Sequence, residues 1–191
     1  PNMILVKNLS TAVDWAVYSS VLGATKYMNL NTTGAAASAT TRWNDTEPTS
    51  TLFSIGNTDL VNTNGDDYIA YCFASVKGYS KFRDYIGNNN VDGPVVYTGF
   101  RPGLVIIKRT DSTGNWFMWD TKRLGYNPNN SYLMPSTTGA ESASTNIDLN
   151  SNGFKIRTTD ADLNAAGGSY IYAAFAEFPL VSSNSKAGTA R

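Results

Sequence analysis

The sequence predicts an all-β fold made of two tandem β-sandwich modules of the jelly-roll or lectin-like kind. Short runs rich in Val, Ile, Tyr, Phe and Trp alternate with stretches of turn-forming residues. Asn-Gly and Asp-Gly pairs, which favour tight turns, recur at 64–65, 92–93 and 152–153. No segment has a sustained helical period with a capping residue. Several short strands separated by such turns are typical of a sandwich.

The second half of the chain repeats the strand pattern of the first half, which indicates a tandem duplication. Four pairs of segments match in order: 3–7 with 104–108, Trp15 with Trp116, 53–55 with 154–156, and 68–74 with 170–176. The matching residues are apolar or aromatic, so they predict a shared packing set. The register shifts only in stretches of Gly, Asn, Ser and Thr, as expected when insertions lie in surface loops.

We expect a first module over residues 1–77, a second over 78–181 and a C-terminal tail over 182–191. The second module opens with residues 78–100, which predict two strands joined by a polar turn at 88–93. The first module has no such hairpin, because Pro1 aligns with Pro102. We therefore interpret it as incomplete at its N-terminal side, with one sheet edge uncovered. A preceding stretch of chain or a neighbouring subunit is expected to pair with that edge.

Composition excludes several classes of partner. The 191 residues carry 15 basic and 15 acidic side chains and no run of Lys or Arg, so no nucleic-acid partner is predicted. No apolar stretch is long enough to predict a membrane span, and no signal peptide is recognisable. Because the first residue is Pro1 rather than Met, we expect the chain to derive from a longer one. The single cysteine, Cys72, cannot form an internal disulfide and is predicted to be a buried thiol, because its neighbours are apolar.

The residue types favour a protein that is not an enzyme and needs no cofactor. The chain has no histidine, which removes Ser-His-Asp and Cys-His arrangements and most zinc sites. Of its glutamates, Glu141 and Glu177 have no acidic counterpart in the first module, which disfavours a paired-carboxylate glycosidase. Asp66 and Asp67 lie in a stretch of oxygen-bearing residues that would suit calcium, but without EF-hand spacing. The alternative role for this pair is in a turn that leads into the next strand.

Once catalysis and nucleic-acid binding are disfavoured, glycan binding is the function that these residues best suit. A solvent-facing ring can lie under a sugar while neighbouring polar side chains hydrogen-bond its hydroxyls. Loop residues that differ between the modules are the best candidates: Arg42, Trp43 and Asn44 in the first, and Asp120, Arg123 and Tyr126 in the second. The alternative is that these aromatic residues cap the sandwich edges or fill a subunit interface.

Both modules resemble a repeated domain of unknown function found in tail-fibre-like and other structural proteins of tailed phages, especially marine ones. That family is considered similar to concanavalin-type lectin sandwiches. In the second module the resemblance lies in GYSKF (78–82), DGPVVYTGFRP (92–102), VIIKR (105–109), NW (115–116), SNGFKIR (151–157), NAAGGSYIYAAFAEFP (164–179) and TAR (189–191). In the first it lies in NMILVKN (2–8), YMNLNTTGA (27–35), FSIG (53–56) and GDDYIAYCFA (65–74). Asp120 and Arg123 also match a family position, where they would either form an ion pair or contact a ligand.

The resemblance implies a virion structural protein on the particle surface, a tail-fibre or appendage adhesin that binds host-surface glycan. Its expected partners are other virion subunits, including copies of itself, with a trimer as one option. Several copies would act together, because single sugar sites are weak. The alternative is a head decoration or assembly protein whose contacts are purely with other proteins, and a depolymerase ranks third.

Overall fold

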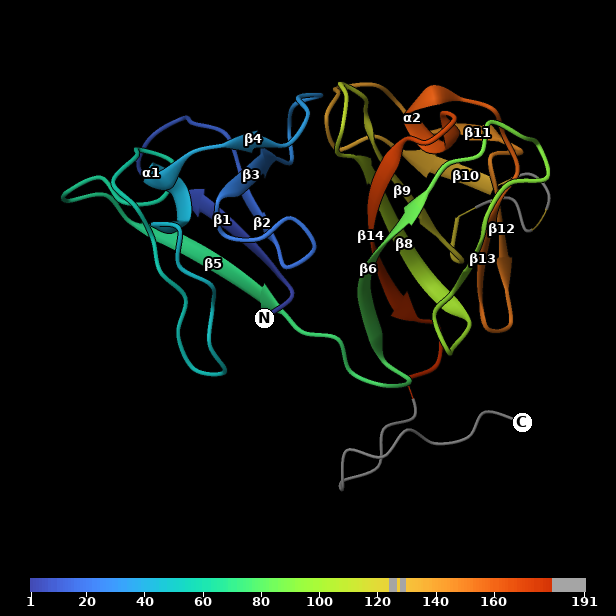
Figure 1. The fold of residues 1–191 in the computed structure, drawn as a ribbon, viewed down its shortest axis with the longest axis horizontal. Helices are drawn as coiled ribbons and strands as arrows, with labels where there is room; N and C mark the ends of the chain where they lie inside the picture. Colours follow the sequence, from blue (N-terminus) through green and yellow to red (C-terminus); the bar gives the residue numbers. More distant parts are fainter. Residues whose placement is uncertain (124–126, 128–129, 180–191) are drawn as a thin grey trace. The chain divides into compact units, whose positions relative to one another are not determined.

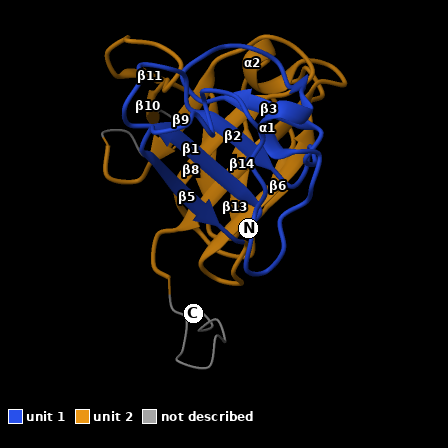
Figure 2. Ribbon diagram, turned by 90° about the vertical axis from the view of Figure 1, so that its left-hand side faces the viewer, with its two compact units in different colours: residues 1–74 blue, residues 75–191 orange. Residues whose placement is uncertain are grey.

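A computed structural model describes residues 1–123, 127 and 130–179 (Figure 1). The chain divides into two compact units, residues 1–74 and 75–191, close to the boundary expected after residue 77 (Figure 2). The all-β class is confirmed, because the described residues form three antiparallel sheets and two helices of four residues. The predicted tail, 182–191, lies outside the described residues. Among the helices that the structure describes, none has the length and apolar character needed to cross a membrane.

Unit 1 forms a single five-stranded sheet with β1 next to its closing strand β5. The order is β4-β3-β2-β1-β5, with bounds Ala37–Ser38, Lys26–Asn29, Ala16–Ser19, Met3–Asn8 and Tyr68–Phe73. The helix α1, Thr40–Trp43, packs on one face of this sheet. Side chains that alternate along β1, Ile4 and Val6, form the core on that face together with Tyr18 and Trp43.

Unit 2 is a β-sandwich of a six-stranded and a three-stranded sheet (Figure 1). The larger sheet has the order β11-β10-β9-β8-β14-β6, with bounds Ser142–Ser144, Asn130–Leu133, Trp116–Asp120, Pro102–Arg109, Ser169–Ala176 and Ser80–Ile86. The smaller has the order β12-β13-β7, with bounds Ile147–Asn150, Gly153–Ile156 and Val95–Tyr97. The rings of Phe154 and Tyr172 meet edge-on across the two layers, with centroids 5.3 Å apart. The short helix α2, Ala161–Asn164, precedes β14.

The two units share a strand order and a local hydrogen-bond arrangement that we call the tyrosine clasp. Order β4-β3-β2-β1-β5 of unit 1 corresponds to β11-β10-β9-β8-β14 of unit 2. The Tyr68 hydroxyl donates to the Asp59 carbonyl and accepts from the Thr63 amide, both at 2.7 Å. In unit 2, Tyr170 makes the same two bonds at 2.7 Å, to Ala161 and from Ala165. The origin of the units by duplication stays a prediction.

The two strands predicted within residues 78–100 form as β6 and β7, but they belong to different sheets and do not pair with each other, so the expected hairpin is instead a strand–turn–strand segment that joins the two sheets. The units differ in this segment. Strand β14 pairs with β8 on one edge and with β6 on the other, whereas β5 pairs with β1 alone. Unit 1, all of whose residues are described, has no counterpart of β6 or β7. Its segment 53–55, which matches β13, forms no strand, and unit 1 has no counterpart of β12 or β7, the two partners of β13. The expected uncovered edge is therefore present on β5.

The prediction of a buried thiol at Cys72 is wrong. Cys72 is exposed, although it pairs with the core residue Ile4 and so lies on the core side of the sheet. Its counterpart in unit 2, Ala174, is fully buried under the second sheet. Apolar neighbours along the strand did not imply burial, because this end of β5 has no second layer over it.

The buried Lys108 on β8 gives the free energy of unfolding a testable pH dependence. Its side chain is fully buried and its Nζ donates to the Arg109 carbonyl at 2.6 Å. Burial lowers the pKa of this ammonium to about 8, against the opposing effect of Asp162. In the unfolded chain the pKa is about 10.4, so between these values the unfolded state binds more protons and the Lys108 contribution to stability rises with pH.

We expect the free energy of unfolding of Lys108→Met minus that of the wild type to fall as the pH rises from 8 to 10, because the wild type gains stability over this range and the variant does not. The change should be at most ~1.4 kcal/mol per pH unit, the limit for one proton. Urea unfolding of both proteins across this range measures the difference, in which tyrosine titrations common to both proteins cancel. A difference that stays constant with pH would contradict the lowered pKa.

Candidate functional site

The three candidates predicted in a loop of the first module, Arg42, Trp43 and Asn44, lie at the end of α1 and face different surroundings. Trp43 is 1% exposed and lies edge-on to Tyr18, with ring centroids 5.8 Å apart. The expectation of a solvent-facing ring at Trp43 is therefore wrong, because this ring fills the core of unit 1. The Arg42 guanidinium lies over the Tyr27 ring, 4.5 Å from its centroid, and donates to the Thr58 hydroxyl at 2.9 Å. Both side chains hold α1 in place.

Asn44 is the member of this group that faces an open hollow. It ends α1 in the left-handed conformation, with φ of 52°. The hollow has a volume of about 430 Å³ and is lined by Asn44, Thr40, Thr41, Ile55, Gly56 and Asn57. Its lining contains no aromatic ring, so it lacks the stacking surface that the glycan prediction requires.

In unit 2, Asp120, the last residue of β9, forms an ion pair with Arg123 in the turn that follows. The Arg123 Nε atom lies 2.7 Å from Asp120 Oδ2, and the same guanidinium also pairs with Glu141. Asp120 Oδ1 accepts the amides of Lys122 and Arg123 at 2.9 and 3.0 Å. These contacts agree with the alternative of an ion pair that holds the loop. Tyr126 lies outside the described residues.

The predicted calcium residues also serve the fold. Asp66 Oδ2 accepts from the side-chain Nδ2 of Asn8 at 2.7 Å and from the Thr11 hydroxyl at 3.1 Å. Asp67 contributes its backbone, which donates to the Ser10 hydroxyl at 2.9 Å. The described part of the chain contains no group of three or more His, Cys, Asp or Glu side chains suited to a metal ion. These bonds fit the role in a turn before the strand.

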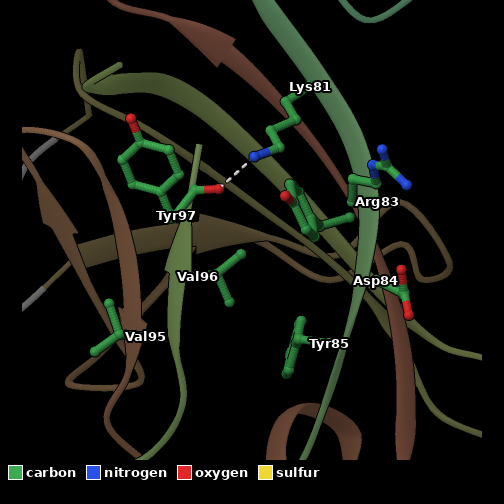
Figure 3. Close-up of a pocket in the computed structure, with 8 residues that line it drawn as sticks. Lys81, Arg83, Asp84, Tyr85, Val95, Val96 and Tyr97 are labelled. Carbon is green, nitrogen blue, oxygen red and sulfur yellow. Dashed lines mark hydrogen bonds between the residues drawn. The ribbon is translucent and has the colours of Figure 1, made fainter. Parts of the chain in front are cut away.

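The most promising feature lies between the edge strands of the two sheets of unit 2 (Figure 3). We call it the β6–β7 groove, an open hollow of about 310 Å³. It is lined by Lys81, Arg83, Asp84 and Tyr85 of β6, by Val95, Val96 and Tyr97 of β7, and by Tyr172 of β14. Because β6 and β7 are edge strands of different sheets, the groove exists only in the unit that contains both strands, which is unit 2.

An exposed aromatic ring lies at the rim of the groove, on the side of β7 that faces away from β6 (Figure 3). Tyr97 is 64% exposed, and Lys81 Nζ donates to the Tyr97 carbonyl at 2.7 Å (Figure 3). The same ammonium lies 5.2 Å from the centroid of the Tyr97 ring, which orients the ring. Partial burial, and secondarily the positive charge of Arg83, lowers the pKa of Lys81. Burial raises the pKa of Tyr172, at the base of the groove, to about 12, so its hydroxyl stays protonated.

Sequence reasoning assigned no role to Tyr97, Arg83 or Asp84. The available signal was that these residues belong to the segment 78–100 that only the second module contains. An exposed aromatic residue at the end of a short strand is indistinguishable from a core residue until the edge of the sheet is known.

The comparisons with known proteins identify a family to which no activity is assigned. The model of a domain of unknown function, DUF7483, matches residues 1–179. The chain belongs to this family. No curated protein and no solved structure matches it. The DUF7483 match spans both units, so the family includes the unit without the β6–β7 segment as well as the unit with it.

The burial of Trp43 leads to a stability prediction. Trp43→Ala should lower the free energy of unfolding of unit 1 by about 3–5 kcal/mol, the range for truncating a large buried aromatic residue. Leu52→Ala, at a side chain that is 71% exposed, is the matched control and should change it by less than about 0.5 kcal/mol. Urea unfolding followed by circular dichroism measures both. Similar losses in the two variants would show that Trp43 does not support the core.

Proposed function

We propose that the chain is a non-catalytic attachment protein of a phage virion, displayed in several copies, whose β6–β7 groove binds host-surface glycan. The observation that carries the proposal is the exposed ring of Tyr97 at the rim of the groove, 5.2 Å from the ammonium of Lys81. The resemblance of the sequence to structural proteins of tailed phages supports the virion context. A displayed array suits this groove, because many weak contacts then add to a firm attachment.

The side chains of the groove match the chemistry of a sugar. The face of Tyr97 suits the apolar C–H face of a pyranose ring. Lys81 and Arg83 are hydrogen-bond donors and share the face of β6 that carries Tyr85, whereas the Asp84 side chain lies on the opposite face. Because the two side chains on the groove face are cationic, the groove favours a glycan that carries a carboxylate or phosphate group.

The same lining argues for binding without cleavage. Glycoside hydrolysis requires two carboxyl groups on either side of the scissile bond. Asp84 is the one carboxylate among the residues that line the β6–β7 groove, and the sequence has no histidine to act as a base. We therefore propose that the bound glycan leaves the groove unchanged.

Tyr97→Ala tests this assignment. On a glycan array probed with the chain multimerised on beads, the wild type should bind a subset of acidic glycans, and Tyr97→Ala should bind them at least tenfold more weakly. The expected loss follows from ~1–3 kcal/mol per stacked ring. Tyr79→Ala is the matched control, because Tyr79 is also exposed, at 46%, and does not line the groove. No binding at any multivalency, or equal binding by the two variants, would refute the glycan site.

A second candidate function is favoured by a separate observation, the unpaired edge of β5. A head decoration or assembly protein would use this edge for contacts with other proteins alone. Virions that lack the chain distinguish the two functions. Normal particles with poor attachment indicate an adhesin, whereas loss of assembled particles with attachment of the remainder intact indicates an assembly component.

A further inference from the structure

The base of the β6–β7 groove holds a tyrosine hydroxyl that the fold does not use. Tyr172 is 2% exposed, yet its hydroxyl makes no hydrogen bond with any residue that the structure describes. The hydroxyl is not enclosed by protein either, so the small exposed part of Tyr172 opens into the groove that this residue lines. A polar group in such a place is favoured when water or a ligand supplies the missing partner. The hydroxyl is therefore available to a ligand.

The other buried tyrosines use their hydroxyls inside the protein. Among the described residues, the hydroxyls of Tyr85 and Tyr170 each donate to a backbone carbonyl at 2.7 Å. The hydroxyl of Tyr18 donates to the Glu47 carboxylate. The ring of Tyr172 packs in the core as a phenylalanine ring would, so packing alone does not explain why this residue carries a hydroxyl.

An uncommitted arginine faces the same hydroxyl. Arg83 lies directly opposite Tyr172 in the ladder between β6 and β14, so both side chains are on the groove face. Within the described part of the chain, Arg83 makes no hydrogen bond or ion pair, whereas every other arginine there makes at least one. Burial raises the pKa of Tyr172 to about 12, and the positive charge of Arg83 opposes this shift. The two groups therefore interact electrostatically, and the hydroxyl stays a proton donor at neutral pH.

Lys81 adds a second cation that crosses the groove. Its Nζ donates to the Tyr97 carbonyl of β7 at 2.7 Å, which leaves two of its three N–H groups for a ligand (Figure 3). The one carboxylate of the lining, Asp84, lies on the opposite face of β6. The free side-chain groups on the groove face are thus a hydroxyl, a guanidinium and an ammonium. Donors of this kind, two of them cationic, favour an oxyanion.

We propose that the base of the β6–β7 groove is a subsite for the carboxylate of an acidic sugar, with Tyr172 as its specificity-determining residue. One carboxylate oxygen accepts from the Tyr172 hydroxyl, and the cations of β6 neutralise the charge. A carboxylate has a single negative charge, which matches the one uncommitted cation, Arg83. A phosphate monoester carries about −1.5 to −2 at neutral pH, which exceeds it. This inference rests on the proposed function, because it names the group of the glycan that the groove recognises.

Titration of the full chain with three monosaccharides tests the choice of anion. Sodium glucuronate, methyl glucoside and glucose 6-phosphate share a pyranose ring and differ in the charged group. In NMR titrations followed on the backbone amides of β6 and β14, glucuronate should bind at least tenfold more tightly than methyl glucoside, the effect of hydrogen bonds to a charged group. It should also bind more tightly than glucose 6-phosphate. Glucuronate that does not bind, or binds no better than methyl glucoside, would overturn the subsite, and tighter binding of the phosphate would overturn its assignment to a carboxylate.

Tyr172→Phe tests the role of the hydroxyl without disturbing the core. Because this hydroxyl has no partner within the described residues, the variant should unfold at the same urea concentration as the wild type. Its affinity for glucuronate should fall about tenfold. Tyr79→Phe is the matched control, since Tyr79 is exposed and lies outside the groove, and it should bind glucuronate as the wild type does. Equal affinities of Tyr172→Phe and the wild type would refute the assignment.

The subsite and the glycan site fail in different experiments. Array binding that depends on Tyr97 but is unchanged by Tyr172→Phe would retain the glycan site and reject the subsite. Absence of array binding at any multivalency would reject the proposed function. Glucuronate binding that depends on Tyr172 would, in that case, still support a carboxylate site in the groove.

Discussion

Every β-strand has two hydrogen-bonding edges, and the pairing of the second edge of the closing strand determines how much of each unit can form. In unit 2, β14 lies between β8 and β6, so the segment that starts with β6 is fixed to the larger sheet. This segment then delivers β7, which pairs with β13 and so supports the smaller sheet. In unit 1 the same closing strand has one partner, and residues 53–55 do not form a strand. The second layer, the buried core beneath it and the β6–β7 groove all depend on this pairing.

The turn before the closing strand is nevertheless the same in both units. The tyrosine clasp fixes the turn before β5 in the geometry of unit 2, with hydroxyl bonds of 2.7 Å in both units. This local structure therefore forms without the β6–β7 segment and without a second layer.

The sequence predicted the features that depend on short-range pattern and repetition. The alternating runs at 3–7 and 68–74 are strands, and the two further strands predicted within 78–100 of the second module are present as β6 and β7. Predictions of which side chains are buried failed where burial depends on what covers the face of the sheet. Trp43 was a candidate for a solvent-facing ring because it lies in a stretch that differs between the modules, yet the short helix turns it into the core. Cys72 was expected inside because its neighbours are apolar, yet nothing covers that end of the sheet. The groove beside Tyr97 escaped prediction because it forms between edge strands of different sheets.

Amide hydrogen exchange on the free chain tests the central claim most directly, because it compares the two closing strands within one molecule. In an antiparallel strand, successive residues direct their amides to opposite edges. The account predicts that alternate amides of β5, those directed away from β1, exchange as fast as amides in exposed loops. In β14, whose two edges are both paired, neighbouring amides should all be protected. Uniform protection along β5, at the level of β14, would show that its second edge is already paired and would contradict the account.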